Sequence, residues 1–434
     1  MTSTWGLRTD RRDKVWLIII GLLGVSCLNR LLKELGRLIW AQGLSGAIDL
    51  KIFYEAVQLW FSGAPTYGVL PSAVYPPASY LMLWPVLGWP TVPVARVFWA
   101  IFSVLALIWL VFVVIRESKA DAWHEKVLMG FLPIFYATRT GIGNGQLTVF
   151  VIPLLIASTL LLHRGTQRTS LVWGAAFMVV ALIKPNVSAP FLWIVLFASM
   201  GRRYWPAPLV LVGYGVLTLW ASAFQAEGAI ALMQQWFQQA AIGAEFGAQT
   251  GGYANQNSLL AWLEANTNLD NYPLLSYIGD FELNTPLTLG MVIALGLWIC
   301  WYRNVEIWLL LGVCAIIARL WTYHRIYDDM LILLPTIATF RVYQRLTAQS
   351  SGFTDSASCG SAITHPPRLQ KTLWQARAAG GLFVMAYVAA IMPANLLEAA
   401  GWLSGAFQTF QIVTWLGLLG FLGYCARDQK QAST

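Results

Sequence analysis

Apolar stretches of about 20 residues recur along almost the whole chain, and they constrain its fold more than any other feature. A stretch of this length is what an α-helix needs to cross the hydrocarbon core of a bilayer. We predict about twelve spans, centred on 15–35, 92–115, 127–142, 146–162, 171–184, 187–200, 205–224, 286–302, 305–321, 330–344, 378–394 and 402–424. The sequence therefore predicts an all-α polytopic membrane protein.

The composition supports lipid as the main solvent of this chain. Hydrophobic residues make up 57% and charged residues 11%, which leaves too little polar surface to coat a water-soluble globule. The net charge of +8 is scattered between apolar runs, so it indicates membrane topology and not a nucleic-acid partner. The 22 Trp and 16 Tyr suit membrane interfaces or a cavity for an amphiphile. We expect membrane lipids as the immediate surroundings.

The cysteines and the N-terminal segment add little chemistry. Five cysteines stand far apart, and no pair has metal-ligand or redox-motif spacing, so we expect neither a disulfide framework nor a metal site. The basic start and the apolar run that ends near Cys27 are similar to a signal peptide, but no clear small-residue cleavage site follows. An uncleaved first span is the favoured interpretation.

The run 171–200 is long for a single crossing and carries Lys184-Pro185-Asn186 near its middle. Because proline breaks or kinks a helix, we predict two short helices that meet at this point. With the break, most Lys and Arg clusters fall in cytoplasmic segments and both termini lie inside. Without the break, every later basic cluster would lie outside.

We expect one integral membrane domain over residues 1–434. The external loop 226–285 contains no Lys or Arg, and the segment 345–376 is rich in Ser, Gly, Thr and Pro. The predicted parts are a core at 15–344 with external loops 41–91 and 226–285, a flexible cytoplasmic linker at 345–376, and a C-terminal helix pair at 377–426.

Polar residues that interrupt apolar sequence fall at the external ends of the predicted spans. Ionisable groups are costly at such depth unless they face water or a polar ligand, so we expect them to converge on one outward-facing cavity. These residues are Asp49, Asn144, Gln146, Lys184, Asn186, Asn255, Gln256, Asn257, His324, Arg325, Asp328 and Asp329.

Asp49 begins an amphipathic stretch whose apolar residues recur at helical spacing. We expect this helix to lie at the outer membrane interface. As the N-cap of the helix, the carboxylate would accept backbone N–H bonds. As a general base, it would accept a proton from an attacking hydroxyl. The residues alone favour the N-cap.

Several short motifs follow one another in a fixed order along the chain. They are Asp49 before an amphipathic helix, Gly63-Ala64-Pro65-Thr66-Tyr67, Tyr75-Pro76-Pro77, Gly145-Gln146, Lys184-Pro185, Asn255-Gln256, and His324 followed by Tyr327-Asp328. This order resembles glycosyltransferase family 87, a group within the GT-C superfamily, and the resemblance covers roughly residues 45–340. The chain departs from the family pattern where many members carry an Arg soon after Asn-Gln.

This resemblance implies a GT-C-like bundle with amphipathic interfacial helices in the first external loop. It implies an inverting transfer of sugar, with mannose as one candidate, from a polyprenyl-phosphate donor to a lipid-linked or surface glycan at the outer face of the plasma membrane. No cofactor or metal is implied.

The resemblance also suggests roles for single residues. Asp49 matches the catalytic base. A cation stabilises the departing phosphate, and Lys184 is the first choice, followed by Arg325 and His324. The residues expected to bind the sugar or the acceptor are Tyr75, Gln146, Asn255, Gln256 and Asp328.

Simpler roles remain open for four of these residues. Lys184 could reach along a helix to the membrane interface, and His324 could be an ordinary hydrogen-bonded interface histidine. Gln146 and Asn255 could equally cap exposed helix ends.

Two other functions would also place polar residues among apolar helices. A secondary transporter or lipid flippase would hold its site near the membrane midplane, with access from both sides. A transferase that uses a cytoplasmic nucleotide sugar would need a nucleotide-binding domain, for which the predicted inner loops are too short.

Overall fold

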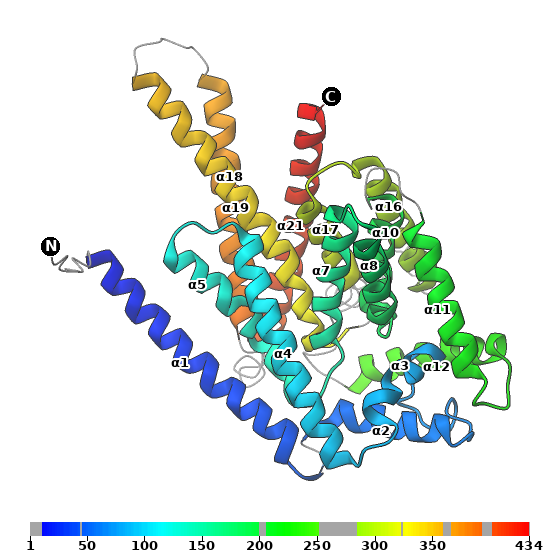
Figure 1. Ribbon diagram of the computed structural model, residues 1–434. Helices are drawn as coiled ribbons and strands as arrows, with labels where there is room; N and C mark the ends of the chain where they lie inside the picture. The colour runs from blue at the N-terminus through cyan, green and yellow to red at the C-terminus, as the bar shows by residue number, and fades with distance from the viewer. Residues whose placement is uncertain are drawn as a thin grey trace.

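The computed structural model is a bundle of helices with shorter helices lying across one end (Figure 1). Its regular structure is α-helix with short 3₁₀ turns throughout the described residues. The structure describes residues 11–43, 46–198, 205–250, 284–322, 324–358, 366–392 and 402–433.

Within those ranges, three helices are long and apolar enough to cross a membrane. They are Lys14–Trp40 within α1 (Arg11–Trp40), Val92–Ser118, which is α4, and Thr409–Ala432 within α21 (Trp402–Ser433). Shorter apolar helices are α7 (Thr148–Arg164), α8 (Arg168–Ala181), Pro185–Phe197, α11 (Pro206–Ser222), Leu289–Tyr302 within α16 (Asn284–Tyr302), and α17 (Ile307–Leu320). The helical membrane protein is supported, whereas the predicted count of about twelve spans is not confirmed.

The predicted break inside 171–200 is present. Helix α8 ends at Ala181, and the chain continues through α9 (Pro185–Ser188), the 3₁₀ turn η3 (Ala189–Phe191) and α10 (Leu192–Phe197). His163 near the end of α7 lies 3.3 Å from the carbonyl oxygen of Ala198. Helix α8 begins just after the C-terminal end of α7. The chain therefore leaves this end of α7 along α8 and returns to it through α10. Two short helices therefore replace one long crossing.

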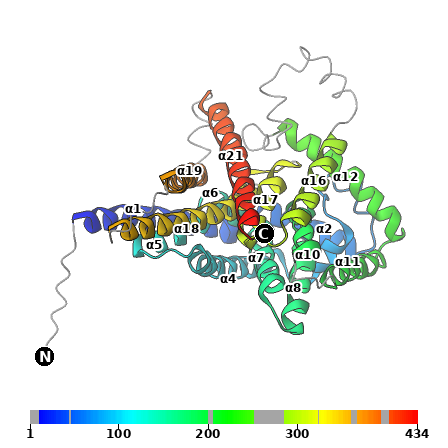
Figure 2. The same ribbon diagram turned by 90° about the horizontal axis from the view of Figure 1, so that it is seen from above.

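Viewed along the bundle, the helices separate into two groups (Figure 2). Helices α1, α4, α5 (Trp123–Phe131) and α18 (Leu333–Ser358) lie on one side, and α10, α11 and α16 lie on the other. Helices α7 and α17 lie between the two groups. Ile307 to Leu320 are almost all buried, which fits the central place of α17.

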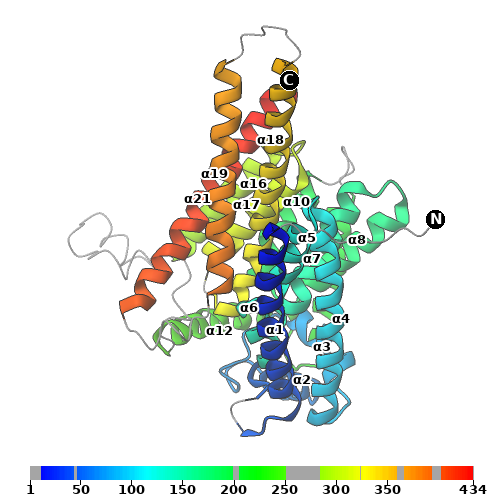
Figure 3. The ribbon, with the colours of Figure 1, turned by 90° about the vertical axis from the view of Figure 1, so that its left-hand side faces the viewer.

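The two ends of the bundle differ (Figure 3). Helices α2 (Ile48–Phe61), α3 (Pro77–Leu87) and α12 (Ala229–Thr250) gather at one end, and α18 and α19 (Pro366–Ile391) project from the other. The segment 345–376 was predicted to be a flexible linker, but it is helical up to Ser358 and again from Pro366. The prediction of a linker is wrong for these two stretches, because helix propagation from the packed parts of α18 and α19 overrides a Ser- and Gly-rich composition.

The amphipathic helix predicted after Asp49 exists as α2, but its apolar face meets protein. Phe53, Ala56, Val57 and Trp60 are buried. The indole N–H of Trp60 donates to the carbonyl of Ala221 in α11 at 2.9 Å, and the Trp60 ring stacks on Tyr80 of α3 at 4.8 Å. Burying each large apolar side chain contributes roughly 1.5–3 kcal/mol, so α2 is held firmly against the bundle end.

Candidate active site

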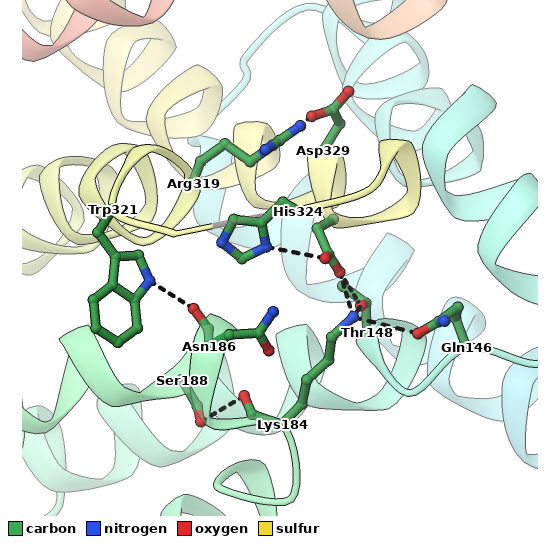
Figure 4. Close-up of polar contacts among 10 residues, drawn as sticks. Gln146, Thr148, Lys184, Asn186, Ser188, Arg319, Trp321, His324 and Asp329 are labelled. Carbon is green, nitrogen blue, oxygen red and sulfur yellow. Dashed lines mark hydrogen bonds and ion pairs between the residues drawn. The ribbon is translucent and has the colours of Figure 1, made fainter. Parts of the chain in front are cut away.

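Lys184 lies in the turn between α8 and α9. A residue before proline is disfavoured in the helical conformation, and Lys184 adopts φ −126° and ψ 79° ahead of Pro185. Ser79 Oγ, near the start of α3, donates to the carbonyl of Ile183 at 2.9 Å and so fixes the turn against α3. The Lys184 side chain consequently points into the protein and is only 3% exposed (Figure 4).

The Lys184 ammonium group is fully engaged by protein groups (Figure 4). Its Nζ donates to Asp328 Oδ1 at 2.6 Å, Thr148 Oγ1 at 2.8 Å and Gln146 Oε1 at 3.3 Å. A lysine ammonium has three N–H donors, so none is left over. Nζ also lies 4.8 Å from the centre of the Tyr327 ring. The alternative that Lys184 reaches to the membrane interface is therefore wrong.

Asp328 is the anion at the centre of this cluster. Besides Lys184, its carboxylate accepts a hydrogen bond from Thr148 Oγ1 at 2.5 Å and one from His324 Nδ1 at 3.0 Å. It lies in the 3₁₀ turn η6 (Ile326–Ile332), and burial alone would raise its pKa, but the Lys184 charge and the His324 hydrogen bond hold the pKa well below its usual range. Asp328 is therefore ionised and positions Lys184 and His324 together.

Asp329 does not join this cluster. Its carboxylate accepts a bond from Arg319 Nε of α17 at 2.6 Å, and both side chains are buried. Successive residues of a 3₁₀ helix point about 120° apart, so neighbours in η6 face different surroundings. The prediction that both carboxylates converge on one cavity is wrong for Asp329, which ties η6 to α17.

His324 presents one unsatisfied ring nitrogen. Because Nδ1 faces the ionised Asp328, Nδ1 carries the proton. Burial lowers the pKa of His324, although Asp328 partly offsets this effect. The ring is therefore neutral, and its buried Nε2, which has no hydrogen-bond partner, is an acceptor. In Figure 4 the ring turns Nε2 away from Asp328, toward the side of Trp321 and Asn186.

Asp49 is not the N-cap of its helix. Ala47 occupies that position with φ 52° and ψ 41°, and no side-chain cap bond forms. Asp49 lies in the first turn and is 9% exposed, and its buried Oδ2 has no hydrogen-bond partner. Burial raises the pKa of this carboxyl, while the Gln146 amide and the charges of Arg325 and Lys184 partly lower it. The cap prediction is wrong, because the carboxylate is buried with one oxygen that has no hydrogen-bond partner.

The loop that ends α6 (Tyr136–Asn144) brings Asp49 and Lys184 together. The N–H of Ala47 donates to the carbonyl of Gly143 at 3.2 Å. Gly145 has φ 74°, which favours glycine, and a Cβ there would lie 2.5 Å from Cβ of Leu50. This close approach places Gln146 between the two charged groups. Gln146 thus links the carboxylate of Asp49 to the ammonium of Lys184.

Tyr75 and Arg325 lie around Asp49. Tyr75 packs edge-on against Phe53 of α2 at 5.1 Å, and its carbonyl accepts a bond from the Tyr67 hydroxyl at 2.6 Å. Arg325 is exposed, in contrast to the buried Lys184, and its charge is close enough to lower the pKa of Asp49. Arg325 therefore lies on the exposed side of this site.

The structure brings together most of the site residues expected from the sequence. Asp49, Tyr75, Gln146, Lys184, His324, Arg325 and Asp328 lie around one cluster, whereas Asn255 and Gln256 fall outside the described residues. Thr148 and the Tyr327 ring were not foreseen as contacts of Lys184. The one sequence signal for Thr148 was its place two residues after Gln146, at the start of an apolar helix.

Comparison with known proteins gives one match. The family model for glycosyltransferase family 87 matches residues 73–331, which is more than half of the chain. The matched segment contains Lys184, His324 and Asp328 but begins after Asp49. No curated protein and no solved structure matches the chain.

Proposed function

Because the chain belongs to glycosyltransferase family 87, we propose that it moves a sugar from a polyprenyl-phosphate donor to a lipid-linked or surface glycan acceptor. Mannose is the first sugar to test. The observation that carries this proposal is the buried Asp49 carboxylate with an unpartnered Oδ2, a short distance from a cluster of cationic and amide side chains.

Asp49 is the proposed general base of an inverting displacement. The acceptor hydroxyl oxygen forms a bond to the sugar C1 as the bond between C1 and the phosphate oxygen breaks. The electron pair of that bond leaves with the polyprenyl phosphate, and the hydroxyl proton passes to Asp49. A raised pKa suits this task, because proton acceptance is more favourable when the base is closer in pKa to the operating pH.

Arg325 is the proposed contact of the donor phosphate, ahead of Lys184. Phosphate oxygens are well matched by the planar guanidinium fork of arginine, which can donate two parallel N–H bonds. All three N–H groups of Lys184 are committed to Asp328, Thr148 and Gln146, whereas Arg325 is exposed beside Asp49. Lys184 then adds a positive charge near the phosphate without contacting it, and its hydrogen bonds keep Asp328 and Gln146 in place.

His324 is proposed to bind a hydroxyl rather than the phosphate. A neutral ring whose Nδ1–H faces Asp328 offers only an acceptor at Nε2. Sugar and acceptor hydroxyls can donate to that nitrogen, and an ionised phosphate cannot. Leaving a buried acceptor such as His324 Nε2 without a hydrogen bond costs about 1–3 kcal/mol of stability. A bound hydroxyl that donates to Nε2 would remove this cost.

The charge distribution supports an external site. The start of α4 lies near α2, because the Tyr54 hydroxyl donates to the carbonyl of Pro90. Arg116 lies at the opposite end of α4, where Arg164 pairs with Glu117 and Arg341 donates to the Glu117 carbonyl. Thr148 and Arg164 mark opposite ends of α7. Cytoplasmic segments carry the excess of Lys and Arg, so the end with Asp49 is proposed to face outward from the plasma membrane. A site at one end of α7 argues against a transporter site at the midplane.

The test is a donor panel with the purified full-length chain in lipid vesicles. Polyprenyl-phosphate sugars and nucleotide sugars are offered separately with glycolipid acceptors, and products are identified by mass and anomeric configuration. We expect product with inverted configuration from a polyprenyl-phosphate sugar. Product formed from a nucleotide sugar in vesicles without polyprenol would overturn the proposal. Movement of the lipid-linked sugar across the bilayer without a new glycosidic bond would indicate a flippase.

A further inference from the structure

A crevice of about 630 Å³ opens between α4, α7 and α8, away from the candidate active site. Its walls are mainly apolar and include Trp109, Phe112, Leu154, Leu160 and Phe177. Ala157 of α7 and Gly165, which directly follows α7, also line it, and their small size leaves the space open. A volume of this size is typical of sites for a small molecule.

The crevice has the length of one lipid chain. Along α7 it extends from Pro153 to Gly165, which at 1.5 Å per residue is about 18 Å. One leaflet contributes about half of the roughly 30 Å hydrocarbon core of a bilayer. A crevice about 18 Å long is therefore long enough to hold a single acyl chain of one leaflet, which spans about 15 Å.

The rim of the crevice is charged. Arg116, Glu117 and Arg164 line it at one end. Glu117 is buried, and both of its carboxylate oxygens accept bonds from Arg164 at 2.6 Å. Trp308 Nε1 adds a bond to Glu117 at 3.1 Å. The negative charge of Glu117 is thus committed to Arg164, and Arg116 remains exposed at the rim, so the rim carries one more positive charge than negative.

We propose that this crevice binds one anionic glycerophospholipid, with an acyl chain between α4 and α7 and the phosphate at Arg116 and the exposed side of Arg164. The site is separate from the candidate active site, because Thr148 and Arg164 stand at opposite ends of α7, about 24 Å apart. In the orientation proposed above, the rim faces the cytoplasmic leaflet, which is rich in anionic lipids.

The test is native mass spectrometry of the full-length chain with phosphatidylglycerol or phosphatidylcholine of identical acyl chains. We expect one retained phosphatidylglycerol per chain and about fivefold weaker retention of phosphatidylcholine, as expected for one additional cationic contact near the membrane surface. Equal retention of the two lipids would overturn the proposal. Lipid retention is measured without any transfer assay, so a failure of this proposal can be distinguished from a failure of the proposed function.

Two matched pairs of variants locate the lipid. Ala157→Phe fills the crevice and should abolish retention, whereas Ile108→Phe places a ring at an exposed position of α4 outside the crevice and should leave it unchanged. Arg116→Gln should weaken retention about fivefold, and Lys126→Gln, which removes one exposed positive charge from α5, should not. If Ala157→Phe fails to fold, the comparison of Arg116→Gln with Lys126→Gln tests the proposal by itself, because both residues are exposed. Equal effects of Arg116→Gln and Lys126→Gln would refute a lipid phosphate at this rim.

Discussion

Replacing Asp49 with asparagine separates catalysis from folding. The amide has the shape of the carboxylate but cannot accept the acceptor proton, so we expect turnover to fall by about 10²–10⁴-fold. This loss corresponds to about 2.7–5.4 kcal/mol in the barrier. Donor binding should be unchanged, because the proposed phosphate contact is Arg325.

The same change should leave stability equal or higher. Asp49 makes no cap bond, and its Oδ2 has no partner. The hydrogen bond from the Gln146 amide can still be accepted by the side-chain oxygen of asparagine. Burial raises the folded-state pKa of this carboxyl, so the folded protein binds the proton more tightly than the unfolded chain. Stability therefore falls as pH rises from the unfolded pKa through the folded one. Asparagine does not ionise, so Asp49→Asn lacks this pH-dependent loss of folding stability. Its Tm at neutral pH should not decrease.

The assay measures transfer, donor affinity and Tm on the same preparation. For the wild type, kcat should fall on acidification through a pKa above the ordinary value for aspartate, because the base becomes protonated. Near-normal turnover of Asp49→Asn would remove Asp49 from the chemistry. Loss of activity together with a clearly lower Tm would show that the carboxylate has a structural role instead.

Three further perturbations test other parts of the site and the topology. Gly68→Ala, at φ 80° with nothing within 4 Å of an added Cβ, should lower stability by about 1–3 kcal/mol through backbone strain alone. Gly145→Ala, at φ 74°, adds a clash with Leu50 to the same strain and should cost clearly more. Equal Tm losses would show that the close approach is unimportant. Arg325→Ala should raise the donor KM at least tenfold, a loss of about 1.4 kcal/mol or more for a charge-assisted bond, with partial rescue by Arg325→Lys. An unchanged KM would assign the phosphate to another cation. In a background without accessible native thiols, Ser62→Cys should react with an impermeant reagent from outside and Gln349→Cys only from inside. Labelling of both from one side would contradict the proposed orientation.

Local sequence patterns were sufficient for the helical architecture and for the break after Lys184. Apolar runs predict helices because each helix satisfies its own backbone in lipid. Proline at position 185 disfavours the helical conformation at Lys184 and starts α9, which is a local effect that can be read from the sequence. The same local order of motifs was enough to indicate family 87, which the family match confirmed.

The tertiary structure alone decided what each polar side chain does. Asp49 looked like a helix cap, but Ala47 is the N-cap of α2 and its N–H donates to Gly143, so the Asp49 carboxylate is buried without a cap bond. Asp328 and Asp329 are adjacent in sequence, yet they pair with Lys184 and Arg319 on different sides of η6. The physical reason is that helix formation depends on neighbours along the chain, whereas a hydrogen-bond partner depends on which helix faces which residue. That choice is made only when α7, α9 and η6 pack together.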